Sequence, residues 1–393
     1  MISISRLLCD SIGPGDSLRY QPVSAAVQGD GMKYHGIPRP VVVWNCTRKC
    51  NLNCIHCYAG AGGDGKSEEM TTAQGMRFID GLSEFGVPVI LLSGGEPLLR
   101  DDLFKLARFA AGKKIRISLS TNGTLITAEA AQRIKDIGFT EVGISLDGIG
   151  AVNDKFRGKD GAYGQALAGI RNCISQGIRV SLRLTITGYN HQEIPAIFKL
   201  AEDENIQRIC FYHLAYVGRG KGLSGKDVTL DQTRRAIDDI CNSTLNLYGR
   251  GLPKEILTVG NHADGVYLYL KTRKNNANRA DKIYNLLKVN GGNNSGIKIS
   301  AVDEMGNVHP DQFWRHYDLG NVKSKKFGEI WADASEPLLE RLRDRKKLLK
   351  GKCGHCKYVD LCNGNLRVRA EAVYHDLWAE DPACYLTDEE IGS

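Results

Sequence analysis

The sequence predicts an α/β protein built on a partial (β/α)6 barrel, a shortened form of the TIM barrel. Between residues 40 and 225, six short runs rich in β-branched residues alternate with longer amphipathic segments. The runs are almost uniformly apolar, which is typical of parallel strands covered by helices. Six such units are fewer than the eight that close a full barrel, so we expect a partial one.

The expected strands are residues 41–45, 87–93, 115–120, 141–146, 178–185 and 208–214. Apolar residues at helical spacing mark the segments between them; Met76, Ile79 and Leu82, for example, share one predicted helix face. Beyond residue 225 the alternation fades. There we expect a long helix over residues 230–249 and a hairpin around residues 305–307.

These patterns divide the chain into four expected segments. Residues 1–39 are an N-terminal extension, and residues 40–225 form the partial barrel. Residues 226–340 supply bridging helices and the hairpin, and residues 341–393 form a cysteine-bound C-terminal domain.

The composition is that of an ordinary globular protein: 42% of the 393 residues are hydrophobic and 25% are charged. No apolar run approaches the ~18–20 residues of a membrane span. The N-terminus lacks the pattern of a signal peptide, so we expect a cytoplasmic protein with reduced thiols. Twelve cysteines in that setting indicate metal ligands. The net charge of +7 is spread along the chain without a nucleic-acid-binding motif, so no nucleic-acid partner is expected.

Three cysteines lie close together in CNLNCIHC, at Cys50, Cys54 and Cys57. Zinc sites and ordinary iron–sulfur clusters take four protein ligands. Three thiolates can hold three irons of a [4Fe-4S] cluster and leave the fourth iron open to a chelating cofactor. A zinc site with His56 or Cys46 as the fourth ligand is the alternative.

Polar, glycine-rich turns follow the next strands at one rim of the predicted barrel, where such folds place their chemistry. GGEP occupies residues 94–97, TNGT residues 121–124 and DG residues 147–148. Together, CNLNCIHC and GGEP resemble the signature of the radical S-adenosylmethionine (SAM) enzymes. The resemblance implies SAM on the open iron, where reductive cleavage gives a 5′-deoxyadenosyl radical. It also implies cofactor-binding roles for Gly94, Gly95, Glu96, Pro97, Ser120, Asn122, Ser145, Asp147 and Arg183. Arg183 is expected to pair with the methionine carboxylate.

The last cysteines, Cys353, Cys356, Cys362 and Cys384, follow the spacing x2, x5 and x21. Spacing alone favours zinc. The tail, however, resembles the auxiliary-cluster (SPASM or twitch-like) extension of radical SAM enzymes, which implies a second [4Fe-4S] cluster. Asp311 stands about where larger relatives carry another cysteine, so we expect one auxiliary cluster. Asn363 replaces a glycine usual in relatives and should adopt its left-handed backbone.

Over nearly its whole length the chain resembles the tetrapyrrole-modifying branch of this family. The stretches that carry the resemblance include VVVWNCTRKCNLNCIHCYA, LTVGNHADGVYLYL and HPDQFWRHYDLGNV. The resemblance is greatest to the AhbC-type didecarboxysiroheme deacetylases, with NirJ as a close relative. It implies removal of two acetate side chains from 12,18-didecarboxysiroheme to give Fe-coproporphyrin III. The alternatives are NirJ-like removal of propionates toward the dioxo haem of nitrite reductase, a peptide-modifying SPASM enzyme, and a non-catalytic electron carrier.

A tetrapyrrole substrate with several carboxylates needs fixed cations, and its iron could take a histidine. The catalytic candidates are Tyr212, His213, Arg315 and His316. Further candidate substrate contacts are Arg219, Arg367, Arg369, His262 and His309. The resemblance also implies an external electron donor similar to flavodoxin or ferredoxin.

Overall fold

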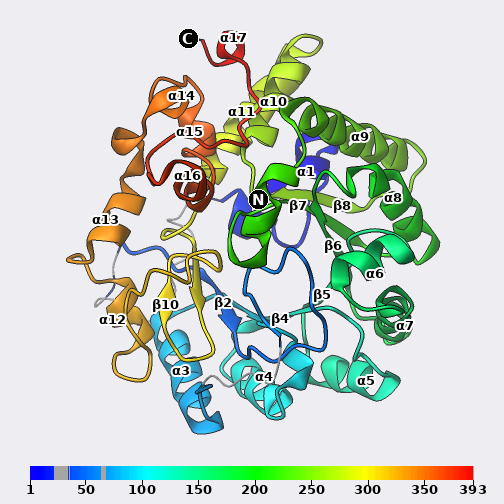
Figure 1. Ribbon diagram of the computed structural model, residues 1–393, viewed down its shortest axis with the longest axis vertical. Coiled ribbons are helices and arrows are strands. Elements are labelled where there is room, and N and C mark those ends of the chain that lie inside the picture. The colour runs from blue at the N-terminus through cyan, green and yellow to red at the C-terminus, as the bar shows by residue number, and fades with distance from the viewer. Residues whose placement is uncertain (22–33, 35, 63–67, 393) are drawn as a thin grey trace.

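The structure, a computed structural model, describes residues 1–21, 34, 36–62 and 68–392, and a single sheet organises them (Figure 1). In spatial order its strands are β1 (Ile2–Ser3), β8 (Glu255–Val259), β7 (Arg208–His213), β6 (Val180–Ile186), β5 (Glu141–Ser145), β4 (Arg116–Thr121), β3 (Val89–Ser93), β2 (Val41–Asn45), β9 (Ile299–Val302) and β10 (Val308–His309). The strands from β8 to β9 in this order run parallel, and β1 and β10 are antiparallel edges.

The six strands expected from the sequence are all present, as β2 to β7. The parallel sheet also continues beyond residue 225, because β8 pairs with β7 and β9 pairs with β2. The expected hairpin is confirmed as β9 and β10, which pair antiparallel around the turn. The segment boundaries at residues 39, 225 and 340 stay a prediction.

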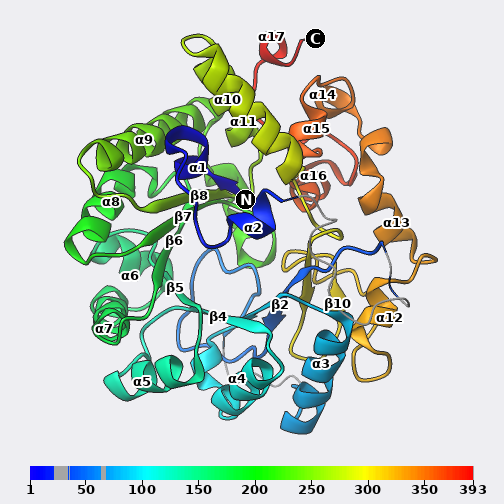
Figure 2. The same cartoon turned by 180° about the vertical axis from the view of Figure 1, so that it is seen from behind.

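Helices ring the outside of the sheet, as Figures 1 and 2 show from opposite sides. They are α3 (Thr72–Phe85), α4 (Leu103–Gly112), α5 (Ala128–Ile137), α6 (Ala151–Arg157), α7 (Ala162–Ser175), α8 (Ile194–Asp203) and α9 (Leu230–Gly249). The long helix predicted over residues 230–249 is α9. It begins at a capping box in which Thr229 and Gln232 satisfy each other's backbone N–H groups.

Apolar packing between the helices and the sheet forms the core. On α3, Phe78, Ile79 and Leu82 are at most 3% exposed. Each such side chain contributes about 1.5–3 kcal/mol on burial. Phe78 packs edge-on against Trp44 of β2, with ring centroids 5.2 Å apart, so the helix is fixed directly to the sheet.

The C-terminal part packs beside β8 and the end of the barrel (Figure 1). Its helices are α10 (Ala263–Arg273), α11 (Ala277–Asn290), α12 (Phe327–Trp331), α13 (Pro337–Arg343), α14 (Gly351–Gly354), α15 (Val359–Cys362), α16 (Arg367–Tyr374) and α17 (Asp388–Ile391). Contacts of α10 and α11 with α15 hold these C-terminal helices together. Within the described ranges, none of the helices has the length and apolar character that a membrane crossing needs.

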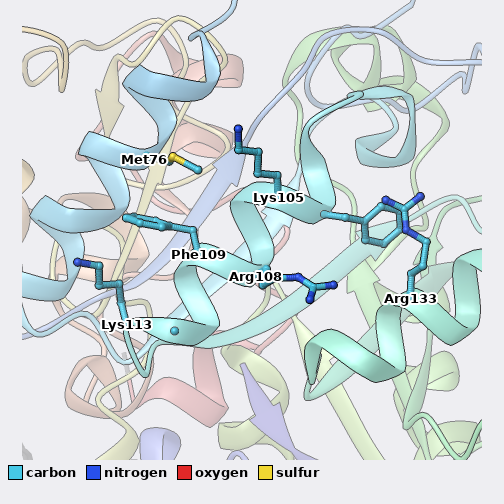
Figure 3. A pocket seen from close by; sticks show the side chains of 8 residues that line it. Met76, Lys105, Arg108, Phe109, Lys113 and Arg133 are labelled. Carbon is cyan, nitrogen blue, oxygen red and sulfur yellow. The ribbon is translucent and has the colours of Figure 1, made fainter.

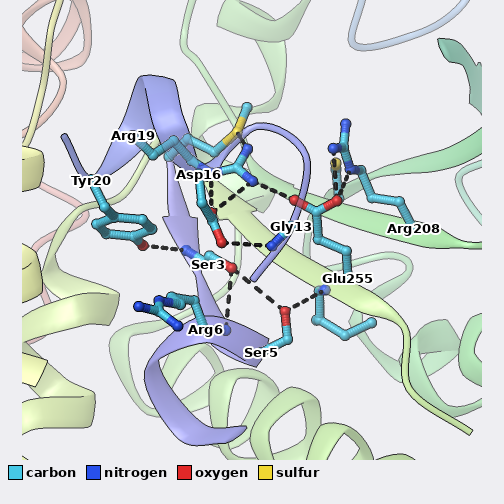
Figure 4. Close-up of polar contacts among 12 residues, drawn as sticks. Ser3, Ser5, Arg6, Gly13, Asp16, Arg19, Tyr20, Arg208 and Glu255 are labelled. Atoms are coloured by element: carbon cyan, nitrogen blue, oxygen red, sulfur yellow. Dashed lines mark hydrogen bonds and ion pairs between the residues drawn. The ribbon is translucent and has the colours of Figure 1, made fainter. Parts of the chain in front are cut away.

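The N-terminal segment, which contains α1 (Ile4–Cys9) and α2 (Asp16–Arg19), closes the barrel at the amino ends of its strands (Figures 2 and 4). Glu255, the first residue of β8, accepts hydrogen bonds from Arg19, from Arg179 at 2.7 Å and from Arg208 at 2.7 Å. Arg208 and Arg179 also pair with Glu141, and Arg19 pairs with Asp16. We call these three arginines and three carboxylates, which balance in charge, the base cage.

We predict that Glu255→Gln destabilises the protein by about 3–5 kcal/mol, because it leaves buried arginines without their carboxylate. Burial raises the pKa of Glu255, but Arg208 and Arg19 lower it overall. The carboxylate therefore stabilises the fold above its unfolded pKa near 4.5, and this stabilisation disappears as the pH falls through the lower folded pKa. Melting temperatures measured from pH 7 to pH 3 should show the parent losing this contribution and the variant lacking it throughout.

The matched control is Asp203→Ala, which removes the exposed ion pair with Lys199 on α8. Exposed pairs contribute little, so its melting temperature should stay close to that of the parent. A Glu255→Gln protein as stable as the Asp203→Ala protein would contradict the role of the base cage.

Candidate active site

A cavity of about 190 Å³, here the upper cavity, lies at the carboxyl ends of the central strands. Of the residues predicted from the sequence, those that line it are Cys50, Cys54, Cys57, Gly94, Gly95, Ser120, Asn122, Ser145, Arg183, Arg219, Tyr212 and His213. Its lining does not include Glu96, Pro97, Asp147, Arg315 or His316. The parallel sheet thus brings the cysteine loop and four separate turns to one place.

The cysteine loop follows β2 and is held by backbone hydrogen bonds to α6. Asn53 N–H donates to the carbonyl of Arg157 at 3.1 Å, and Ile55 N–H donates to that of Phe156 at 3.0 Å. From the other side, Arg219 in the 3-10 segment η5 (Gly218–Lys226) donates through Nε to the Cys54 carbonyl at 2.7 Å. Its Nη1 donates to the Ala61 carbonyl at 2.7 Å.

The GGEP turn after β3 holds the same loop. Gly95 N–H donates to the Thr47 carbonyl at 2.7 Å, and Glu96 N–H donates to the Lys49 carbonyl at 2.8 Å. A Cβ atom on Gly95 would lie 2.1 Å from the Lys49 carbonyl oxygen, so only glycine permits this approach. The glycines of this turn therefore allow the close backbone approach that was expected, and the backbone they approach is that of the cysteine loop.

Glu96 is completely buried and joins two rim turns. Its carboxylate accepts hydrogen bonds from Thr121 Oγ1 at 2.8 Å, Asn122 N–H at 2.8 Å and Leu98 N–H at 3.1 Å. Burial raises its pKa. The expected contact with the cofactor stays a prediction; in this structure the side chain braces the turn that carries Asn122.

Asp147 is also completely buried and faces α6 and the cysteine loop. Its Oδ2 lies 2.5 Å from Arg157 Nη2 and 3.2 Å from His56 Nε2, and its Oδ1 accepts a hydrogen bond from Thr185 N–H at 2.8 Å. Arg157 Nη1 lies 3.7 Å from Cys54 Sγ. Arg157 was not identified from the sequence. Arg157 ends α6, the helix that directly follows the turn with Asp147, and this proximity in sequence could have suggested that the two residues pair.

The cysteine thiols are suited to a metal centre. Burial raises the pKa of Cys50 to about 11 and also raises that of Cys54, which Arg157 partly offsets. Metal binding displaces thiol protons, so buried thiols beside a fixed cation favour a bound cluster over three free thiolates. The two fourth ligands considered for zinc are engaged elsewhere: His56 faces Asp147, and Cys46 is completely buried in the core.

The four C-terminal cysteines come from α14, the following turn, α15 and the last loop, and they line one common cavity. Asn363, which ends α15, has φ = 55°, so the expected left-handed turn is confirmed. Its side-chain amide donates to the Asn293 carbonyl at 2.8 Å, and Asn293 N–H donates to the Cys362 carbonyl at 3.0 Å. Four thiolates are a ligand set for either zinc or a [4Fe-4S] cluster. In the described part of the chain, no three His, Cys, Asp or Glu side chains are arranged to hold a single metal ion.

Most other candidate substrate residues have protein partners. Arg315 pairs with Glu304 at 2.9 Å and His316 with Glu371 at 2.8 Å. Arg369 forms a buried pair with Asp381 at 2.8 Å. The remaining partners are backbone carbonyls for Arg367, Met1 for His262, and Asp303 and the Tyr317 carbonyl for His309. Only Tyr212, His213 and Arg219 of these candidates line the upper cavity.

A second hollow lies outside the barrel between α3, α4 and α5 (Figure 3). Met76 and Phe109 are apolar residues of its lining, and Lys105, Arg108, Lys113 and Arg133 are its basic residues. Its lining includes neither set of cysteines, so it is separate from the candidate active site.

The sequence profile of the Radical SAM superfamily matches residues 44–201, which include the cysteine loop and the rim turns. The chain belongs to this superfamily and is a radical SAM enzyme, which uses SAM and a [4Fe-4S] cluster.

Two characterised relatives cover most of the chain. It is 51% identical over 395 residues to the Fe-coproporphyrin III synthase of Methanosarcina barkeri, covering 100% of this chain and 99% of that protein. It is 46% identical over 361 residues to the pre-heme d1 synthase of Dinoroseobacter shibae, covering 91% and 89%. Among solved structures, SuiB of Streptococcus suis bound to S-adenosylmethionine matches with a TM-score of 0.68 at 18% identity, over 90% of this chain and 80% of that one. The last match supports the fold.

We predict that Arg219→Ala makes the cluster of the cysteine loop easier to remove, because the loop loses two hydrogen bonds from a charged donor. Such bonds contribute about 1.5–3 kcal/mol each, so iron loss to a chelator should be roughly tenfold faster or more. The measurement is the rate of iron release from reconstituted protein under anaerobic conditions.

Lys221→Ala is the matched control, since Lys221 lies two residues further along η5 and is exposed. Its iron should leave at the parent rate. Arg219→Lys should recover little, because a single ammonium cannot reproduce the forked contact. Equal release rates for Arg219→Ala and Lys221→Ala would refute the bracing role.

Proposed function

We propose that the protein converts 12,18-didecarboxysiroheme to Fe-coproporphyrin III by removing two acetate side chains, a step of the alternative haem pathway. The observation that carries this proposal is the 51% identity to the Fe-coproporphyrin III synthase, which extends over the whole of both chains. The match includes the C-terminal cysteine region as well as the barrel.

The residues of the upper cavity would serve the cofactor. Cys50, Cys54 and Cys57 would hold the [4Fe-4S] cluster, and the backbone of Gly94 and Gly95 would face the bound SAM. Together, cluster and cofactor supply a radical that abstracts hydrogen from the substrate. Ser120, Asn122 and Ser145 present polar groups to the same cavity. Asp147 and Glu96 do not line the cavity and would act indirectly. Asp147 would hold Arg157 in place, and Glu96 would hold Asn122.

The four C-terminal cysteines would hold a second [4Fe-4S] cluster. Loss of an acetate side chain leaves a fragment that needs an electron, and an auxiliary cluster is a suitable acceptor or donor of single electrons. An external protein similar to flavodoxin or ferredoxin would reduce the first cluster. His213, which lines the upper cavity, has its Nε2 2.9 Å from Asp264 Oδ2 on α10.

Two other functions stay open. Removal of propionates instead of acetates has in its favour the 46% identity to the pre-heme d1 synthase. Peptide modification has weaker support, from relatives no more than 27% identical and from fold similarity to SuiB at 18% identity.

The mass of the product distinguishes these functions. Reduced, reconstituted protein is incubated anaerobically with 12,18-didecarboxysiroheme and SAM. We expect Fe-coproporphyrin III, which has lost two acetate groups and kept its propionates. A product that has lost propionates would establish the alternative, and an unchanged tetrapyrrole despite SAM cleavage would overturn both.

We predict that Cys353→Ser/Cys356→Ser removes about four of roughly eight irons per chain and leaves the first cluster in place. The variant should still form 5′-deoxyadenosine but no porphyrin. Iron and sulfide analysis, together with electron paramagnetic resonance of the remaining cluster, checks this. One zinc and about four irons in the parent would contradict a second cluster.

Cys241→Ser is the control for the loss of buried cysteines. Cys241 is a buried residue of α9 in the hydrophobic core, and it lines neither cysteine cavity. This variant should keep the full iron content of the parent.

A further inference from the structure

A larger cavity of about 440 Å³, here the lower cavity, lies inside the barrel between the upper cavity and the base cage. Leu91, Arg183, Gln312 and Phe313 line both cavities. The two spaces therefore meet around these four side chains, in the middle of the barrel. A ligand that binds at the rim can extend into the barrel at this point.

The lower cavity has a charged wall, and three of the six arginine and lysine side chains described in its lining are neutralised by carboxylates. Arg19, Arg179 and Arg208 belong to the base cage, where three carboxylates balance them. These arginines hold the fold together and are not free to bind a ligand.

Arg183 differs from the arginines of the base cage. It lies on β6, and its Nη1 donates to Ser120 Oγ on β4 at 2.5 Å. Its Nε is buried and has no hydrogen-bond partner, and no carboxylate pairs with it among the residues that the structure describes. Leaving a buried N–H of a half-buried guanidinium without a partner is costly, and this cost favours an anion at the junction of the two cavities.

The backbone is shaped around this guanidinium. Gly143 on β5 lies beneath it, and a Cβ atom at that position would be 2.2 Å from Arg183 Nε. The absence of a side chain at residue 143 thus makes room for the cation. Glycine inside a strand often marks a place where another group approaches the backbone closely, and here that group is the Arg183 guanidinium.

Gln312 supplies a second polar group at the same junction. Its Oε1 is buried without a hydrogen-bond partner in the described structure. Because the two ends of a side-chain amide can exchange places, Gln312 can donate to a carboxylate that Arg183 binds. The neighbouring Phe313 packs edge-on against Tyr58, with centroids 5.5 Å apart, and fixes this segment against the cysteine loop.

Arg183 lines the upper cavity together with the cysteines, but it also extends to the lower cavity. The methionine end of SAM has to reach the open iron of the cluster, beside the three cysteines. Arg157, which pairs with Asp147, lies at that place, 3.7 Å from Cys54 Sγ. Arg157 does not line the lower cavity, whereas Arg183 does.

We propose that Arg183, with Gln312, binds a side-chain carboxylate of the tetrapyrrole substrate at the junction of the two cavities. The inference rests on the proposed function, and it assigns a substrate-binding role to a residue first expected to serve SAM. One carboxylate arm of the macrocycle enters the barrel, and the ring stays at the rim beside the cofactor. Arg183 therefore helps to determine which edge of the ring faces the reacting atoms.

The test compares a carboxylate ligand with its ester. Parent and Arg183→Gln proteins are titrated with iron coproporphyrin III and with its methyl ester, and the Soret absorbance gives the two dissociation constants. Arg183→Gln should weaken binding of the acid roughly ten- to a hundredfold and change binding of the ester little. SAM affinity, measured by calorimetry without porphyrin, should stay within about twofold of the parent value.

Each outcome bears on a different claim. If the parent binds neither porphyrin, the proposed function fails. If the parent binds the acid and Arg183→Gln binds it equally well, the function stands and the role of Arg183 is refuted. If Arg183→Gln binds SAM more weakly and porphyrin equally well, the proposal is refuted, and Arg183 instead binds the methionine carboxylate of SAM.

Two further variants separate this role from a structural one. Arg183→Lys keeps the charge and should recover part of the affinity for the acid. Gly143→Ala keeps Arg183 but pushes its guanidinium aside, so it too should weaken binding of the acid more than of the ester. Circular dichroism and iron content equal to the parent show that each variant is folded and loaded.

Discussion

The geometry of the candidate active site depends on how the cysteine loop is fixed. Its described residues include no helix or strand between β2 and α3, so the loop depends on hydrogen bonds from its neighbours. Three segments supply them: the GGEP turn after β3, the end of α6 after β5, and η5 after β7. All three follow parallel strands of one sheet. The position of the three thiols is therefore a consequence of the sheet, and a change at any of these turns alters the loop.

The fold could be predicted where the sequence pattern was unambiguous. Runs rich in apolar and β-branched residues identified β2 to β7, because a barrel strand needs apolar side chains where its outer face packs against helices. The pattern missed β8 and the parallel pairing of β9 with β2. The run EILTV of β8 begins with Glu255, whose charge belongs to the base cage, and β9 has only four residues after an amide-rich stretch. Their strand character comes from pairing with β7 and β2, which the local sequence does not display.

The candidate site was predictable to a similar extent. The cysteines and glycines follow from metal chemistry and tight turns, whereas the availability of an arginine depends on its partners. Arg219 and Arg369 appeared suitable for substrate carboxylates, but the structure bonds one to the cysteine loop and the other to Asp381. Arg183 looks no different in sequence. It stands apart because it lines both cavities with its Nε unpaired, and because Gly143 leaves room for it.

The two cysteine regions are joined through buried polar contacts, and this affects how their variants are interpreted. Asp264 on α10 lies 2.9 Å from His213 Nε2 in the wall of the upper cavity and accepts a hydrogen bond from Tyr385 at 2.8 Å. Tyr385 directly follows Cys384. Disturbing the C-terminal cysteines can therefore displace His213 without any loss of electron transfer. Loss of porphyrin formation alone would therefore not establish an electron-transfer role. The same variant must also bind the tetrapyrrole as the parent does, because unchanged binding shows that His213 and the cavity around it are undisturbed.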